Sequence, residues 1–257
     1  MPKVQRFRSV ARMTFMWGQR MKSWRYILAG PSALLILLAV SLAPPALGQD
    51  APSLKSQFET ARTAADWKGM EAAARQLVAA EPKNWEYQGA LADALYNQGK
   101  YAEAALSYQA AISLAGGSPN DDAKRAVGRM LMSEGNANIK LRNYDAAILL
   151  FEKAARTDPN PATAYFNLCA TEYNLAQLGP AEASCDKAIQ YDPKRADLYF
   201  IKGSILVGNA AVKPGGKMAF SPGAAPALRK YLELAPAGGH ADDAKQMLDF
   251  IEQNNSK

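Results

Sequence analysis

The sequence predicts an all-α solenoid of antiparallel helix pairs, and three observations support this fold class. Apolar residues recur at helical spacing over residues 53–252. Five segments of similar pattern superimpose without gaps, and four of the five end in proline. Their ends stand 34, 43, 34 and 43 residues apart, at Pro82, Gly116, Pro159, Pro193 and Pro236. A fixed period of this length is typical of helical-repeat architectures, whereas a bundle of unrelated helix pairs would not require it.

The first 48 residues differ from the rest of the chain. Residues 1–25 contain seven Lys and Arg residues and no acid, and residues 26–43 carry no charge. This is the layout of a secretory signal, so we expect residues 1–48 to be a signal peptide cleaved before Gln49. Alternatively, the uncharged stretch is long enough to act as an uncleaved membrane anchor. Met21 offers a second start that keeps the same export signal.

The basic character of the chain comes from this leader. Without its seven cations, 23 Lys and Arg residues face 24 Asp and Glu residues, a net charge of −1. No basic stripe with interleaved aromatic residues remains, so we expect no nucleic-acid partner.

Small residues recur in the second helix of the repeats. They stand twelve residues before each end, at Ala104, Ala147, Ala181 and Ala224, with Met70 as the exception. Large residues follow four positions later, at Tyr108, Phe151, Cys185 and Leu228. In these positions and in its period, the chain resembles the tetratricopeptide repeat (TPR) family. The resemblance implies a right-handed superhelical solenoid in which small residues let paired helices approach closely.

The matching first helices carry their own small residue, at Ala92, Gly135, Cys169 and Gly203. We therefore expect a solenoid over residues 49–257, with a loose, capping-like first repeat. A helix beginning near His240 is expected to close the last apolar face. The expected repeats cover about 53–82, 84–117, 119–160, 161–194 and 195–236, and the capping helix covers about 240–253.

Two repeats are nine residues longer than the others. In the third repeat, Ser118 followed by Pro119 and two acids suggests an N-cap and a helix extended at its N-terminus. In the fifth repeat, the Gly- and Pro-rich segment 207–226 predicts a loop between the two helices. It carries Lys213, Lys217, Met218 and Phe220. We expect a passive connection there, or else a ligand-contacting or β-hairpin element.

Both cysteines lie in the fourth repeat, sixteen residues apart. The family register places Cys169 in the first helix opposite Cys185 in the second. In an oxidising compartment the pair could form a disulfide worth about 3 kcal/mol by the loop-entropy estimate, and the alternative is two buried thiols.

Catalytic and metal-binding chemistry is not expected. The chain has one histidine and two cysteines, so neither a Ser-His or Cys-His mechanism nor a metal-ligand cluster has the residues it needs. No cofactor is expected.

The family resemblance implies a protein or peptide partner on the concave face formed by the first helices. Asn side chains can pair with a peptide backbone, while aromatic residues and Met bury its side chains. Alternatively, these positions are ordinary solvated or inter-repeat residues. The candidate positions are Asp93, Tyr96, Asn97, Arg129, Met132, Asn136, Lys140, Phe166, Asn167, Tyr173 and Phe200.

These observations favour an exported, periplasmic or secreted scaffold that binds other proteins. Two alternatives stay open: a membrane-anchored assembly factor for an envelope complex, and an accessory subunit of an enzyme complex. Any membrane contact would come from an uncleaved leader, through residues 26–43. Homo-oligomers are compatible with the loose first repeat.

Overall fold

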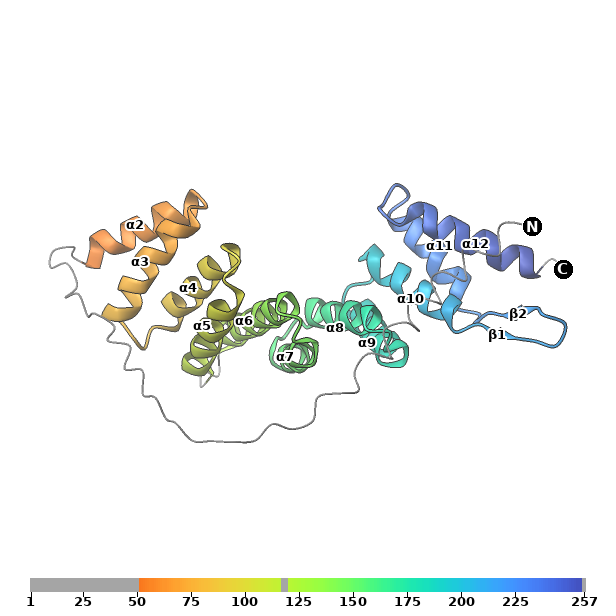
Figure 1. Ribbon diagram of the computed structural model, residues 1–257, viewed down its shortest axis with the longest axis horizontal. Helices are drawn as coiled ribbons and strands as arrows, with labels where there is room; N and C mark the ends of the chain where they lie inside the picture. Colours follow the sequence, from red (N-terminus) through yellow and green to blue (C-terminus); the bar gives the residue numbers. More distant parts are fainter. Residues whose placement is uncertain (1–50, 117–119, 256–257) are drawn as a thin grey trace, which may run out of the picture. The chain divides into compact units, whose positions relative to one another are not determined.

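The computed structural model describes residues 51–116 and 120–255, and these form helices joined by short turns, with one small hairpin (Figure 1). The predicted signal segment 1–48 lies outside the described residues. Within the described ranges, the first repeat contains α2 (Ala51–Thr63) and α3 (Trp67–Ala80), and the remaining pairs follow the same order. They are α4 (Trp85–Asn97) and α5 (Tyr101–Ala115), α6 (Asp121–Lys140) and α7 (Tyr144–Thr157), α8 (Ala162–Asn174) and α9 (Leu178–Tyr191), and α10 (Ala196–Gly208) and α11 (Ala224–Leu234), closed by α12 (Ala241–Asn255).

Each helix packs mainly on its neighbours in the sequence, as in a solenoid. The predicted all-α solenoid of helix pairs is therefore confirmed. Its core consists of the small and large residues of the repeat pattern: Ala104, Ala147, Ala181 and Ala224 are fully buried, and Phe151 and Leu228 fill the spaces beside them. Close approach is required at Gly135, where a Cβ atom would lie 2.5 Å from the ring of Phe151.

The turn within each of the first four helix pairs has the same backbone conformation. In each turn, one residue adopts positive φ. It lies five positions before the residue that is Met70 in the first repeat and an alanine in the others, and these turn residues are Ala65, Gly99, Arg142 and Ala176. The amide that follows it bonds back to the first helix: Lys100 to the carbonyl of Leu95 at 2.9 Å, and Gln177 to that of Glu172 at 2.9 Å. Left-handed residues of this kind end helices by satisfying their last carbonyl groups.

The two longer repeats differ as the sequence predicts, with one correction. Helix α6 has 20 residues, so the predicted extension is confirmed. Its N-cap is Asn120 rather than Ser118, because the Asn120 side chain accepts a hydrogen bond from the Asp122 amide at 2.8 Å. Ser118 lies outside the described residues.

The nine extra residues of the fifth repeat form a β-hairpin of β1 (Ala211–Val212) and β2 (Met218–Ala219). Asn254 of α12 holds β2 through both backbone groups of Met218, accepting from its amide at 2.9 Å and donating to its carbonyl at 2.6 Å. The ring of Phe220 contacts that of Phe250 edge-on. The passive-loop prediction was therefore wrong and its β-hairpin alternative is confirmed.

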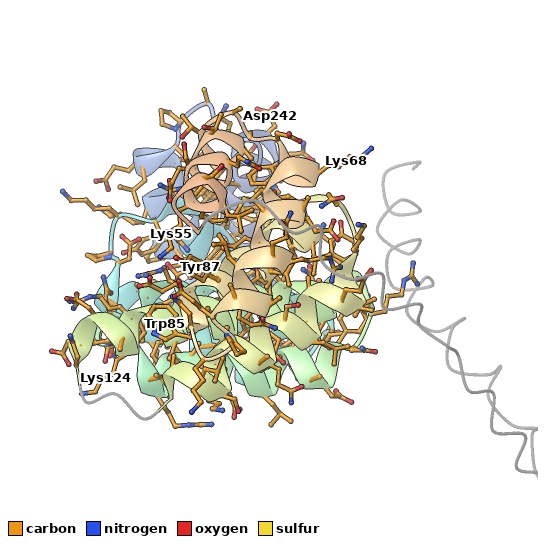
Figure 2. All side chains as sticks on the ribbon, turned by 90° about the vertical axis from the view of Figure 1, so that its left-hand side faces the viewer. Lys55, Lys68, Trp85, Tyr87, Lys124 and Asp242 are labelled. Carbon is orange, nitrogen blue, oxygen red and sulfur yellow. A yellow bond between two sulfur atoms is a disulfide. The ribbon has the colours of Figure 1, made fainter. Side chains whose placement is uncertain are left out.

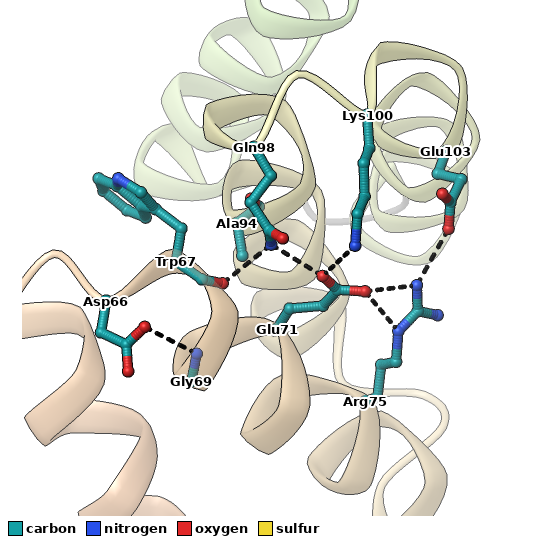
Figure 3. Close-up of polar contacts among 9 residues, drawn as sticks. All are labelled: Asp66, Trp67, Gly69, Glu71, Arg75, Ala94, Gln98, Lys100 and Glu103. Carbon is teal, nitrogen blue, oxygen red and sulfur yellow. Dashed lines mark hydrogen bonds and ion pairs between the residues drawn. The ribbon is translucent and has the colours of Figure 1, made fainter.

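The first two repeats are joined by a cluster of polar and charged side chains on α3, on α5 and in the turn before α5 (Figure 3). Glu71 accepts hydrogen bonds from Lys100 at 2.7 Å and Gln98 at 2.8 Å, and it pairs with Arg75. Arg75 continues to Glu103 at 3.0 Å. The Lys100 ammonium, with Arg75 and Gln98 as further donors, holds the pKa of the Glu71 carboxyl at about 2, below its ordinary value, and outweighs the opposite effect of burial.

Candidate functional site

Two of the predicted binding residues, Asp93 and Arg129, line a cleft of about 450 Å³. Its walls come from the first helices α2, α4 and α6, with Met70 of α3 and Tyr108 of α5 at the floor. Aromatic rings enter from Phe58, Trp85 and Tyr87. Figure 2 shows Trp85 and Tyr87 together with Lys55, which lies 5.7 Å above the Tyr87 ring. A cleft with apolar walls and a few polar groups is the usual form of a peptide or ligand site.

Asp93 is the acidic centre of this cleft. The hydroxyl of the buried Tyr108 donates to its Oδ1 at 2.5 Å. Partial removal from water by the cleft walls raises the pKa of the Asp93 carboxyl, against the lowering effects of the Tyr108 hydroxyl and the Arg129 charge. Burial likewise raises the pKa of the Tyr108 hydroxyl, so Tyr108 stays protonated and remains a donor.

Three charged groups at the cleft, Glu86, Asp93 and Arg129, form no salt bridge within the described ranges. Glu86 lies in the first turn of α4, and Arg129 lies on α6, where its charge acts on Asp93 from beyond ion-pair distance. By contrast, Arg62 is neutralised locally by Glu59 at 2.6 Å. Glu86 and Arg129 can therefore pair with charged groups of a bound chain without breaking an existing ion pair.

The other predicted residues on α4 and α6 lie outside this cleft. Tyr96 contacts the ring of Tyr101 edge-on, with 5.3 Å between ring centroids, and Asn97 donates to the backbone carbonyl of Asp93. On α6, Met132 is partly buried against the core. Asn136 is partly exposed, and Lys140 is exposed in the last turn.

The predicted residues of the later repeats are divided between surface and core. Phe166, Asn167 and Tyr173 are partly exposed on α8, and the guanidinium of Arg195 lies 4.3 Å from the Phe166 ring centroid. Phe200 is buried, with its ring stacked 4.1 Å from that of His240. The segment before α12 covers it, so Phe200 belongs to the core of the C-terminal repeat and offers no open surface to a partner.

Several cleft residues were missed at the sequence level: Phe58, Trp85, Glu86, Tyr87 and Ser133. The repeat register could have found Glu86, because it stands six residues before Ala92, just as Arg129 stands six before Gly135. Phe58 carried no such signal, since it occupies the place of a small residue in the loose first repeat.

Three further observations concern the described residues. Cys169 and Cys185 lie at disulfide distance across α8 and α9, with Cα atoms 4.9 Å apart, as the predicted pair requires. No cluster of metal-ligating side chains occurs in residues 51–116 and 120–255. Within the same ranges, no helix has the length and apolar character needed to cross a bilayer.

The family is decided by a family model described as "Tetratricopeptide repeat", which matches residues 57–121 and 132–196, half of the chain. The chain belongs to the tetratricopeptide repeat family. TPR folds serve as protein-interaction scaffolds, so the family gives this chain that general role and names no partner.

Solved structures share the fold at low sequence identity. A TPR protein from Parabacteroides merdae ATCC 43184 is 17% identical, with a TM-score of 0.61 over 81% of this chain and 76% of that one. YrrB, described as a TPR protein with an unusual peptide-binding site, is 17% identical, with a TM-score of 0.58 over 77% and 92%. MamA from Desulfovibrio magneticus RS-1 is 18% identical, with a TM-score of 0.58 over 76% and 99%. No curated protein matches the sequence.

Proposed function

We propose that this TPR protein is an exported scaffold that binds a peptide segment of a partner protein in the cleft between α2, α4 and α6. The observation that carries the proposal is the composition of the cleft. Aromatic rings of Phe58, Trp85 and Tyr87 stand beside Glu86 and Arg129, which form no salt bridge with any described residue. Rings provide contact area with little loss of side-chain freedom, and the two charges fix the register of a bound chain.

Export is supported by the leader pattern of residues 1–48 and by the cysteine pair. Disulfides persist in oxidising compartments, and Cys169 and Cys185 stand at bonding distance. The mass of the intact protein purified from its native host tests this part. A chain beginning at Gln49 supports an exported soluble scaffold, whereas a chain retaining residues 26–43 supports the membrane-anchored alternative.

Charge reversal tests the cleft. We expect the purified protein to capture a partner from native envelope extract, and Arg129→Glu or Glu86→Lys to reduce recovery at least about tenfold, because the reversed charge would repel the group that the original charge attracts. Lys68→Glu is the matched control, because Lys68 is exposed on α3 away from Trp85 and Tyr87 (Figure 2). The captured partner should cross-link to α2, α4 or α6. Equal recovery on all baits, or cross-links elsewhere only, would contradict binding in the cleft.

A further inference from the structure

A second groove, separate from the cleft, lies between the second helices α5 and α7. It has a volume of about 500 Å³, and α6 forms its floor. Its apolar lining comes from Ile112, Val127, Leu131 and Leu150, of which the first three are buried. The groove therefore offers an apolar trough between two helices of successive repeats.

Exposed leucines flank this groove. Leu106 of α5 is 68% exposed and Leu149 of α7 is 64% exposed. Both stand ten residues before the end of their repeat, so they occupy the same position on the two helices. Leu106 lies one turn before the groove residue Gln109, and Leu149 one turn before Lys153. Single exposed leucines are common, but two in register beside an apolar groove indicate a contact surface.

An ion pair bridges the corresponding groove between α3 and α5. There Arg75 reaches Glu103 at 3.0 Å across the two helices (Figure 3). In the repeat register, Gln109 takes the place of Arg75 and Ala146 takes the place of Glu103. An amide and a methyl group cannot form that ion pair, and among the described residues no salt bridge joins α5 to α7. The α5–α7 groove is therefore left unbridged.

A single carboxylate stands on the floor of the groove. Glu134 directly precedes Gly135, and the equivalent residues Leu91 and Leu168 of the neighbouring repeats are buried in the core. Desolvation raises the pKa of the Glu134 carboxyl to about 6, with the Lys153 charge as the opposing influence. Its carboxylate has no hydrogen bond or ion pair to any described residue. Glu134 is partly exposed, and a chain laid over the groove would remove the rest of its carboxylate from water. An ionised carboxylate buried in this way without a partner is costly, and a cation placed against it recovers that cost.

We propose that the α5–α7 groove binds an amphipathic helix of a partner protein whose apolar face carries one lysine or arginine that pairs with Glu134. A third helix fits between two parallel helices by packing its side chains into their groove. Its leucine-type residues would cover Ile112 and Leu131 and meet the flanking Leu106 and Leu149. The cation selects the partner, because any other residue would leave Glu134 buried and unpaired.

Three synthetic helical peptides test the proposal. They share one leucine-lined face and differ only in the central residue of that face, which is Lys, Leu or Glu. Binding of each labelled peptide to the purified protein is measured by fluorescence anisotropy. We expect the Lys peptide to bind at least about tenfold more tightly than the Glu peptide. Glu134→Gln should bring that ratio close to one, and Glu134→Lys should reverse it.

Variants of exposed residues distinguish this surface from the cleft. Leu106→Ser combined with Leu149→Ser should weaken all three peptides, while Arg129→Glu, in the cleft, should leave their affinities unchanged. The proposal is overturned if none of the peptides binds, or if Glu134→Gln leaves the Lys-to-Glu ratio as it was. It is also overturned if sedimentation shows a dimer that the double leucine variant dissociates, because the groove would then be an interface between two copies of this chain.

Discussion

At the level of single residues, the contact between paired helices depends on positions that have almost no side chain. Gly135 on α6 faces Phe151 on α7, and Phe151 is 1% exposed. The ring is therefore almost fully enclosed by other residues. This is the place in the third repeat where the helix separation is set.

Gly135→Ala is expected to destabilise the protein by about 1–3 kcal/mol, because the new methyl group would overlap the Phe151 ring. The free energy of unfolding in urea measures the effect. Gly208→Ala is the control, since a Cβ atom at Gly208 meets nothing within 4 Å. A Gly135→Ala protein as stable as the control would show that the two helices can separate at little cost.

In the turns within the helix pairs, two residues with a Cβ atom adopt a left-handed backbone conformation that glycine adopts with less strain. Ala176 has φ 57° and Arg142 has φ 63°, whereas the equivalent residue of the second repeat is Gly99. Ala176→Gly is expected to stabilise the protein by about 0.5–1 kcal/mol, because a left-handed conformation is strained for residues with a Cβ atom. Thermal unfolding measures it, and a lower midpoint than wild type would contradict the expectation.

Glu134 carries a stability penalty that its binding role would explain. Its folded-state pKa of about 6 lies above its ordinary value of 4.5, so the ionised side chain lowers stability above pH 6 and ceases to do so below about pH 4.5. Glu134→Leu should therefore raise the free energy of unfolding by about 1–2 kcal/mol at pH 7 and change it less at pH 4. An equal gain at both pH values would show that packing, not charge, is responsible.

At the level of elements, the fourth repeat is the one with a cysteine pair at disulfide distance. Cys169 and Cys185 are both fully buried, and they face each other across α8 and α9, sixteen residues apart in the sequence. Reduction should lower the stability of the protein by about 3 kcal/mol, because the unfolded chain regains the freedom that the closed loop removed. Thermal unfolding with and without reductant measures this, and the Cys169→Ala, Cys185→Ala double variant should not respond to reductant at all.

The helix pairs were predictable from the sequence because their signals are local. Proline ends each second helix except one, and small residues mark the contacts inside each pair. The cysteine pair followed from the same register. The hairpin was not settled by local pattern, since Asn254 holds Met218 from 36 residues away. The burial of Phe200 escaped prediction for the same reason: the covering His240 belongs to a different element.

At the level of the whole molecule, the repeats are held together by different forces along the chain. The first two share the ionic cluster of Glu71, Lys100, Arg75 and Glu103. The fourth and fifth are joined by the Lys202–Asp186 ion pair between α10 and α9, and buried apolar clusters lie between all the neighbouring repeats. In a solenoid, stability is a sum over neighbouring repeats, so these differences act locally.

Acid should weaken the first interface selectively. The folded-state pKa of Glu71 is about 2, below its ordinary value of 4.5, so its contribution is complete above pH 4.5 and is lost as the pH falls towards 2. Glu71→Gln should cost about 1–2 kcal/mol at pH 7, a value reduced by the exposure of Arg75 and Lys100, and should have little effect at pH 2. Urea unfolding at both pH values measures it; an equal loss at both would contradict the ionic explanation.

The link in the fourth repeat also determines how the protein would be degraded. A protease attacks segments that open first, and in a solenoid a terminal repeat, which has a neighbour on one side only, opens most easily. The pair α8 and α9, with Cys169 and Cys185 at disulfide distance, stands between the N-terminal repeats and the C-terminal repeat. Limited proteolysis should therefore remove the N-terminal repeats first and leave a resistant fragment that begins near residue 160. With reductant present, this fragment should no longer accumulate.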